Sequence, residues 1–247
     1  MNIRHLLLDI EGTTCPASFV SETLFPFARE SLPRFVTNNH GESCVKEILK
    51  AAQHEWDNDI TEASIKLRRE HEHASNKNEA YTGLIEYLLH LIKIDKKSTA
   101  LKDLQGKIWL AGYQKGELKA EIFPETADCF QHWIGEKLLI SSYSSGSIQA
   151  QKLLYKNTNR GDLSPSINQW FDTHTGNKKH SLSYTKISQK LKALTSEILF
   201  ISDNHKECDA AKDAGMQTLF SLRRGNPDQN PAGHTIIRSL TEVVLYF

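Results

Sequence analysis

The acidic residues Asp9 and Glu11 are the first feature of the chain that could perform chemistry. They close the apolar run of residues 5–10 and precede Gly12. A carboxylate can attack phosphorus as a nucleophile, and a second one can protonate the leaving oxygen and then activate water. Gly12 lets the backbone bend closely around a ligand. The pair fits phosphoryl transfer through an enzyme aspartate; the alternative is two solvated carboxylates at a turn.

Two polar stretches further along the chain could bind a phosphate. The serine-rich residues 141–147 follow a second apolar run, and hydroxyl and backbone N–H groups at a helix start can cradle an anion. Lys178 lies in the polar stretch 176–179, where an ammonium could neutralise developing charge. Each stretch has an ordinary alternative, because serines often cap helices and loop lysines are usually solvated.

Asp203 ends another apolar run, residues 197–202, and Asp209 lies six positions further on in a helix-like segment. Acidic oxygens at such a place can hold Mg²⁺, which prefers oxygen ligands and keeps several waters. The alternative for Asp203 is a helix N-cap.

Four short apolar runs must position these residues. They cover residues 5–10, 137–142, 197–202 and 217–222, and a helix-like segment follows each. Continuous apolar runs suit strands that are buried on both faces of a parallel sheet, and alternation with helices predicts a right-handed α/β fold. Ligands bind at the carboxyl ends of strands in such sheets, which is where the candidate residues fall.

A helical segment interrupts this alternation. Residues 16–120 have long charged faces and few β-branched runs. We therefore predict an α/β core with a Rossmann-like parallel sheet, formed by residues 1–15 and 121–247, and a helical cap of residues 16–120 inserted after the first strand. Inserts at this place often act as lids.

Composition narrows the class of protein. The chain has 247 residues, and its 30 Lys and Arg balance 30 Asp and Glu. A net charge of zero argues against a nucleic-acid or anionic-membrane binder, and no apolar run approaches the roughly 20 residues that span a bilayer. Four widely spaced cysteines without a CxxC pattern predict reduced thiols in a cytoplasmic protein.

The order of the motifs resembles that of the haloacid dehalogenase superfamily, in which a strand-ending Asp, a serine-rich turn, a loop Lys and a second strand-ending Asp follow one another. The resemblance narrows to the enolase-phosphatases of methionine salvage, which have Glu where most relatives have a second Asp. It runs over nearly the whole chain, through LLLDIEGTTCPASFV, LFPFARESLP, KSTALKDLQGKIW, GYQKGELKAEIFP, YSSGSIQAQKLL, WFDTHTGNKKHSLSY and EILFISDNHKECDAAKDAGMQT.

The resemblance implies a role for each acidic residue. Asp9 would attack phosphorus, and Glu11 would act as the general acid and base. Asp9, Glu11 and Asp203 would bind one Mg²⁺, with Glu11 contributing its backbone carbonyl. Asp209 would lie behind these ligands. Asn204 and His205 replace the small apolar pair that is more usual after the metal-binding Asp, which removes no ligand.

The resemblance also implies that Ser144, Ser145 and Lys178 bind the substrate phosphate, and that Lys178 stabilises the covalent intermediate. The implied substrate is 2,3-diketo-5-methylthiopentyl-1-phosphate, a small phosphorylated diketone that would be enolised and then dephosphorylated to the acireductone. A monomer is implied, with neither nucleic acid nor membrane as partner.

Three alternatives remain open at this point. A phosphatase of the same fold could act on another small phosphate ester. A signalling receiver domain would accept phosphate on Asp without turnover, but the helical insert and Glu11 argue against it. Dehalogenation at carbon would need neither Mg²⁺ nor Asp203.

Overall fold

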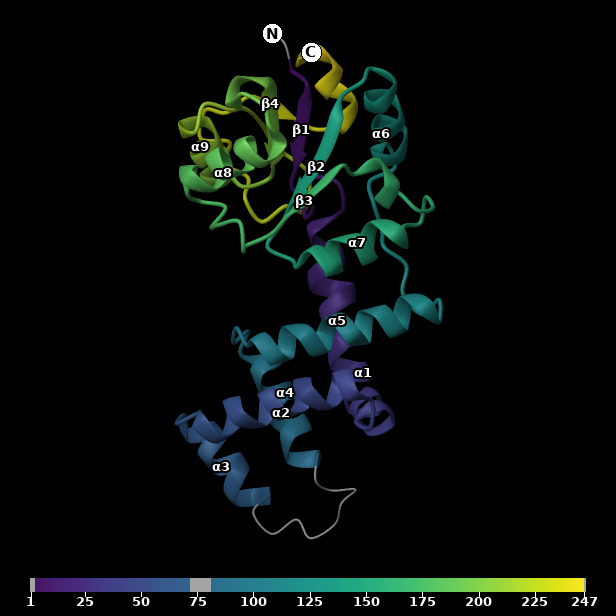
Figure 1. Ribbon diagram of the computed structural model, residues 1–247, viewed down its shortest axis with the longest axis vertical. Helices are drawn as coiled ribbons and strands as arrows, with labels where there is room; N and C mark the ends of the chain where they lie inside the picture. Colours follow the sequence, from purple (N-terminus) through teal and green to yellow (C-terminus); the bar gives the residue numbers. More distant parts are fainter. Residues whose placement is uncertain (1–2, 72–80, 247) are drawn as a thin grey trace. The chain divides into compact units, whose positions relative to one another are not determined.

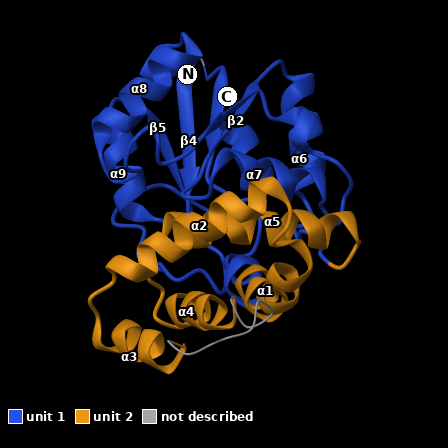
Figure 2. Ribbon diagram, turned by 60° about the horizontal axis from the view of Figure 1, so that its bottom comes forward, with its two compact units in different colours: residues 1–22, 118–247 blue, residues 23–117 orange. Residues whose placement is uncertain are grey.

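The computed structural model describes residues 3–71 and 81–246. The chain divides into two compact units, coloured separately in Figure 2. The first comprises Met1–Glu22 and Leu118–Phe247, and the second comprises Thr23–Glu117. We call them the core unit and the helical unit, and describe each by itself. The assignment of a catalytic core and a cap stays a prediction.

The core unit contains a parallel sheet, as the apolar runs predict. In the described residues its strand order is β3-β2-β1-β4-β5-β6. The strands are β1 (His5–Leu8), β2 (Leu139–Tyr143), β3 (Gln169–Phe171), β4 (Ile198–Ser202), β5 (Gln217–Ser221) and β6 (Ile236–Ile237). The predicted α/β fold is confirmed.

Helices cover both faces of this sheet. They are α6 (Thr126–Gly135), α7 (Ile148–Lys156), α8 (Ser181–Leu191) and α9 (His205–Asp213), with short 3-10 turns at Ser164–Ser166, Thr195–Glu197 and Leu240–Tyr246. Figure 1 shows α6 and α7 on one side and α8 and α9 on the other. Every residue of β1 and β4 is consequently buried, which explains why these strands are apolar apart from His5 and Ser202 at their ends.

The strand order places the crevice of the sheet at β1. From β1 the chain proceeds outward through β2 and β3, and then crosses to β4, β5 and β6 on the opposite side. The reversal of direction separates the loops that follow β1 and β4. Ligands bind at such a switch point in open α/β sheets, and Asp9 and Asp203 immediately follow these two strands.

Aromatic rings tie the strands to α8. Tyr184 of α8 packs edge-on against Phe200 of β4, with ring centroids 5.0 Å apart, and against Tyr143 of β2 at 5.6 Å. The Tyr184 hydroxyl donates to the Lys178 carbonyl at 2.7 Å, and the Tyr143 hydroxyl donates to the Gly176 carbonyl at 3.0 Å. The core packing therefore fixes the loop that carries Lys178.

The helical unit has its own core. Its helices are α1 (Phe25–Asn39), α2 (Ser43–Asn58), α3 (Glu62–His71), α4 (Thr82–Lys93) and α5 (Thr99–Gln114), and a π-helical turn, Phe19–Leu24, leads into α1. Leu32, Leu49, Leu88 and Leu104 are buried together in one cluster. The predicted helical character of this segment is confirmed.

His71 of the helical unit contacts Glu86 at 3.0 Å, and His73 lies outside the described residues. All four cysteines are free thiols, and only Cys44 is exposed. Among the described residues, no helix combines the length and apolar character needed to cross a membrane.

A buried carboxylate joins three segments of the helical unit. Asp59 is 8% exposed and accepts hydrogen bonds from the Ser64 hydroxyl at 2.9 Å, the Tyr87 hydroxyl at 3.2 Å and the Lys96 ammonium at 2.9 Å. Burial alone would raise its pKa, but the bonds from Lys96 and the Thr61 N–H outweigh burial and lower it. The ionised form of Asp59 therefore stabilises the helical unit.

We predict that Asp59→Asn lowers the opening free energy of the helical unit by about 1–3 kcal/mol, because buried donors lose an ionised acceptor. Hydrogen exchange of peptides from α2 to α4 measures this. In the natural chain the stabilisation should be lost as the pH falls below about 4, since the folded pKa is below the unfolded one. Asp57→Asn, at an exposed neighbouring carboxylate, is the control; equal protection in both variants would contradict the prediction.

Candidate active site

Lys178 joins segments of the chain that follow three different strands. Its ammonium lies 2.7 Å from Asp9 Oδ1 and 2.6 Å from Glu207 Oε2. The residue is only 7% exposed, so it is not the solvated loop lysine of the ordinary alternative. Burial would lower its pKa, but the two carboxylates raise it, and the ammonium stays charged. A fixed positive charge therefore lies beside the carboxyl end of β1.

The carboxylate of Asp9 is held on both oxygens. Oδ1 also accepts the Ile10 N–H at 2.8 Å, and Oδ2 lies 3.0 Å from the Ser202 hydroxyl. The Asp9 N–H donates to the Ile201 carbonyl of β4 at 2.9 Å. These bonds orient the carboxylate within the crevice between β1 and β4.

The turn after Asp9 brings Asp203 against it. Gly12 has a φ of +67°, and a Cβ atom there would lie 2.2 Å from Asp203 Oδ2. Only glycine fits, because both the backbone conformation and the neighbouring carboxylate exclude a side chain. The turn is closed by bonds from the Cys15 N–H to the Ile10 carbonyl and from the Gly12 N–H to the Cys15 carbonyl. Neither bond uses the Glu11 carbonyl.

Four carboxylates and one ammonium meet in this region. Burial, followed by the charge of Asp9, raises the pKa of Glu11 to about 7. The same two causes raise the pKa of Asp203, and burial is also the main cause of the raised pKa of Glu207. The negative charge exceeds what Lys178 alone can offset, and a divalent cation would restore the balance.

The oxygen donors near Asp9 suit Mg²⁺, which needs few protein side chains as ligands. The part of the chain that the structure describes contains no group of three or more His, Cys, Asp or Glu side chains arranged to hold a metal. A site made from the side chains of Asp9 and Asp203 and the backbone carbonyl of Glu11 has only two such side chains. Mg²⁺ commonly takes one or two carboxylates and completes its octahedron with water.

The serine-rich turn differs in part from the expected cradle. Ser144 is buried and its hydroxyl accepts the Gly146 N–H at 3.1 Å, whereas Ser145 is exposed. The N–H of Ile148, the first residue of α7, donates to the buried carboxylate of Asp172 at 3.3 Å. This helix amide is already satisfied, so phosphate binding would rest on the hydroxyls and the turn.

The structure corrects the expectation for Asp209. Its side chain is 54% exposed and pairs with His234 at 2.9 Å. Glu207, which the sequence reasoning missed, is the residue of this helix whose carboxylate contacts Lys178. Glu207, Cys208 and Ala211 form the buried face of α9, so the helical period around Cys208 and Ala211 was the signal that could have found it.

The residues around Asp203 also decide its role. Asn204, not Asp203, caps α9 by accepting the Lys206 N–H at 3.1 Å, which excludes the N-cap alternative for Asp203. His205 lies 2.6 Å from Asp228 in the loop after β5. The two unusual residues of the motif therefore anchor the helix and a neighbouring loop.

Two further residues that the sequence reasoning missed hold the turn from the side of β5. The Gly12 carbonyl accepts the Ser221 hydroxyl at 2.9 Å and the Asn226 amide at 3.0 Å. Asn226 is buried and also donates to the Ser221 carbonyl. No sequence pattern marks an Asn this far from Asp9, so only the fold reveals its position.

This fold and this site define a class of hydrolase. Residues 3–215 match the family model of the haloacid dehalogenase-like hydrolases. The described structure superposes on an L-2-haloacid dehalogenase, RSc1362, with a TM-score of 0.56 over 100% of this chain and 99% of that one; at 14% identity this likeness concerns the fold. The chain belongs to the haloacid dehalogenase-like hydrolases.

The similarity to individual proteins is closer. The chain is 55% identical to enolase-phosphatase E1 of Parasynechococcus marenigrum over 100% of both chains. It is 39% identical to that of Pseudomonas aeruginosa over 99% of this chain and 100% of the relative. The UTR4 protein of Saccharomyces cerevisiae, 33% identical, superposes with a TM-score of 0.75 over 96% of this chain and 98% of that one. Within the hydrolases, the chain belongs to the enolase-phosphatase family.

We predict that Asn226→Ala lowers turnover by about 10–100-fold, because groups that orient metal ligands and their loops typically have effects of this size. The apparent affinity for Mg²⁺ should fall in parallel, which a purely global loss of stability would not cause. Steady-state rates across a Mg²⁺ titration measure both effects. Asn230→Ala, at an exposed position of the same loop, is the control. Wild-type Mg²⁺ dependence in Asn226→Ala would refute the role.

Proposed function

We propose that the protein enolises 2,3-diketo-5-methylthiopentyl-1-phosphate and then hydrolyses the phosphate to give the acireductone of methionine salvage. Membership of the enolase-phosphatase family supports the reaction. The observation that carries the phosphatase step is the buried Lys178 ammonium against Asp9, with Glu11 of raised pKa in the same turn.

We assign the metal ligands to the Asp9 and Asp203 carboxylates and the Glu11 carbonyl. Bound there, Mg²⁺ would offset the charge of the phosphate and orient it for in-line attack. The excess of negative charge and the donor chemistry of these residues support this assignment.

Asp9 attacks phosphorus in line and forms an aspartyl phosphate. Lys178 lies 2.7 Å from Asp9 and offsets the charge that develops on the phosphoryl oxygens. The hydroxyls of Ser144 and Ser145 bind the same phosphate from the turn after β2. The resemblance to the enolase-phosphatases is the basis for proposing a monomeric enzyme.

Glu11 supplies the proton transfers. With a pKa of about 7, a substantial fraction of its side chain carries a proton at neutral pH. That proton goes to the leaving alkoxide as the P–O bond breaks. The resulting carboxylate then takes a proton from water, which attacks the aspartyl phosphate and releases inorganic phosphate.

The helical unit is the proposed cap, which would select the diketone among small phosphate esters. Its separate hydrophobic core and its position in the chain between β1 and β2 support this role. We place the enzyme in the cytoplasm, where free thiols such as its four cysteines stay reduced.

We predict that Asp9→Asn abolishes phosphate release, by roughly 10³-fold or more, because an amide is a very poor nucleophile. The measurement uses a panel of phosphate esters with and without Mg²⁺, and the diketone phosphate is followed by the absorbance of its enediol. Asp213→Asn, at an exposed carboxylate of the core unit, should behave as wild type. Retained phosphate release in Asp9→Asn would exclude Asp9 as the nucleophile. A stronger preference of the natural enzyme for another ester would exclude the diketone phosphate as its substrate.

We predict that Glu11→Gln accumulates phosphorylated enzyme when an activated ester is supplied. A good leaving group needs little protonation, whereas hydrolysis of the acyl phosphate still needs a base. Rapid-quench mass spectrometry of the intact protein detects the added phosphoryl group. Glu136→Gln, at an exposed residue, is the control. An unphosphorylated Glu11→Gln that turns over at the wild-type rate would exclude Glu11 as the base.

A further inference from the structure

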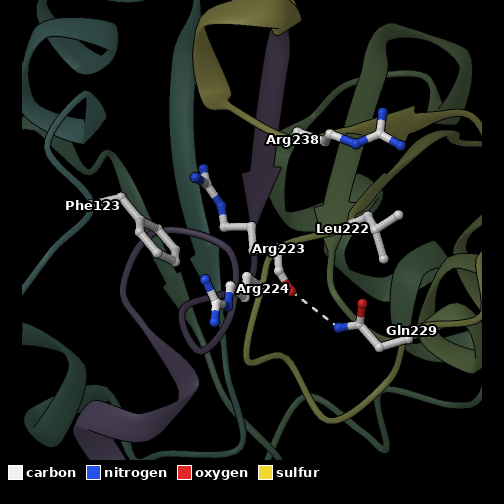
Figure 3. Close-up of a pocket in the computed structure, with 6 residues that line it drawn as sticks. All are labelled: Phe123, Leu222, Arg223, Arg224, Gln229 and Arg238. Carbon is white, nitrogen blue, oxygen red and sulfur yellow. Dashed lines mark hydrogen bonds between the residues drawn. The ribbon is translucent and has the colours of Figure 1, made fainter.

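A pocket separate from the candidate active site lies on the core unit, at the ends of β5 and β6. Its cavity measures about 600 Å³, within the range of small-molecule sites. We call it the arginine pocket, and Figure 3 shows its lining residues: Phe123, Leu222, Arg223, Arg224, Gln229 and Arg238. None of the candidate catalytic residues lines it.

The arginine pocket is strongly positive in a chain with no net charge. Three guanidinium groups line it, and one of them, that of Arg223, pairs with the Glu125 carboxylate at 2.8 Å. Within the described residues, Arg224 and Arg238 form no ion pair. Figure 3 shows the guanidinium groups of Arg223 and Arg224 on the same side as Phe123. Unbalanced arginines in a concave site favour an anion.

Arg223 forms a rigid wall of this pocket. Its side chain is 9% exposed, and its guanidinium stacks on the Phe123 ring at 3.8 Å from the centroid. The buried Nε atom of Arg223 has no hydrogen-bond partner. Buried polar atoms are nearly always satisfied, so this unpaired donor is an unusual feature of the wall.

The loop that carries Arg223 and Arg224 is held in place by Gln229. The Gln229 amide donates to the Arg223 carbonyl at 3.0 Å, drawn in Figure 3, and to the Asn226 carbonyl at 2.8 Å. Little conformational entropy would be lost when a ligand binds to such a loop. Phe123 and Leu222 add apolar surface beside the charged groups.

We propose that the arginine pocket binds a small organic anion. A carboxylate or phosphate group of the ligand contacts the guanidinium groups of Arg223 and Arg224, and Arg238 on the other side of the pocket adds a second unpaired charge. An apolar portion of the ligand contacts Phe123 and Leu222. Bidentate pairing with guanidinium is the usual recognition of such groups. The proposal concerns binding and does not depend on the catalysed reaction.

The pocket adjoins the turn that carries Asp9 and Glu11. Arg223 Nη2 donates to the Thr13 carbonyl at 3.4 Å, and the Phe123 N–H donates to the Thr14 carbonyl at 3.0 Å. A ligand that contacts Arg223 and Phe123 therefore touches residues that support the catalytic turn. Binding at the arginine pocket would leave the phosphate site open.

The test is calorimetric titration of the full chain with phenylphosphonate, which combines an anion with an apolar ring and cannot be hydrolysed. Methylphosphonate provides the anion alone, and benzyl alcohol provides the ring alone. The test variant is Arg224→Gln combined with Arg238→Gln. The control is Lys186→Gln combined with Lys212→Gln, which removes the same charge from exposed positions outside the pocket. Turnover and thermal unfolding confirm that both variants are folded.

We expect phenylphosphonate to bind the natural chain more tightly than either partial probe does. The arginine variant should bind it about tenfold more weakly or worse, since each charged contact contributes on the order of a factor of ten, and the lysine variant should bind it normally. Equal affinity in all three proteins would overturn the proposal. The proposal would also be overturned if the substrate competitively displaced phenylphosphonate, because the probe would then be bound in the active site alone. If the natural chain bound phenylphosphonate in this way but did not turn over the diketone phosphate, the proposed function would fail and the binding proposal would stand.

Discussion

The site depends on the ion pair that Lys178 makes with Asp9 and Glu207, at 2.7 and 2.6 Å. A buried ammonium is stable only with partners of opposite charge, because desolvation otherwise costs several kcal/mol. The two carboxylates come from the end of β1 and from α9, and the lysine comes from the loop after β3. One interaction thus fixes three segments that are far apart in the chain. Tyr143 and Tyr184 pack against each other in the core, and their hydroxyls hold the lysine loop by hydrogen bonds to its carbonyls.

The charges around this pair explain how one site can offer both a nucleophile and an acid. The ammonium contacts Asp9 and Glu207 directly, whereas Glu11 lies in the same turn with burial and the Asp9 charge raising its pKa to about 7. Glu11 therefore holds a proton more readily than an ordinary glutamate does. Different environments for paired carboxylates are the usual way in which enzymes divide acid and base roles. The same crowding of negative charge makes the site suitable for a divalent cation.

The sequence was informative where a strand ends and uninformative where the fold brings distant residues together. Apolar runs located the strands, and the rule that ligands bind at their carboxyl ends placed Asp9 and Asp203 in one crevice. Glu207 was overlooked in favour of Asp209, although a 3.6-residue period turns Asp209 outward. Asn226 and the arginine pocket carry no local pattern, because Asn226 is 214 residues from Gly12 and the arginines are a hundred or more residues from Phe123 in the sequence. Helical character was readable over residues 16–120, but which residues recognise the substrate depends on tertiary arrangement.

Calorimetric titration with Mg²⁺ at about pH 7, in two buffers of different ionisation enthalpy, tests the central claim most directly. Glu11 and Asp203 have raised pKa values when only Lys178 offsets their charge, so they hold protons that a bound cation would displace. The account predicts proton release on binding, and an apparent Mg²⁺ affinity that rises between about pH 6 and 8 as these groups ionise. Binding without proton release, at an affinity independent of pH, would contradict it.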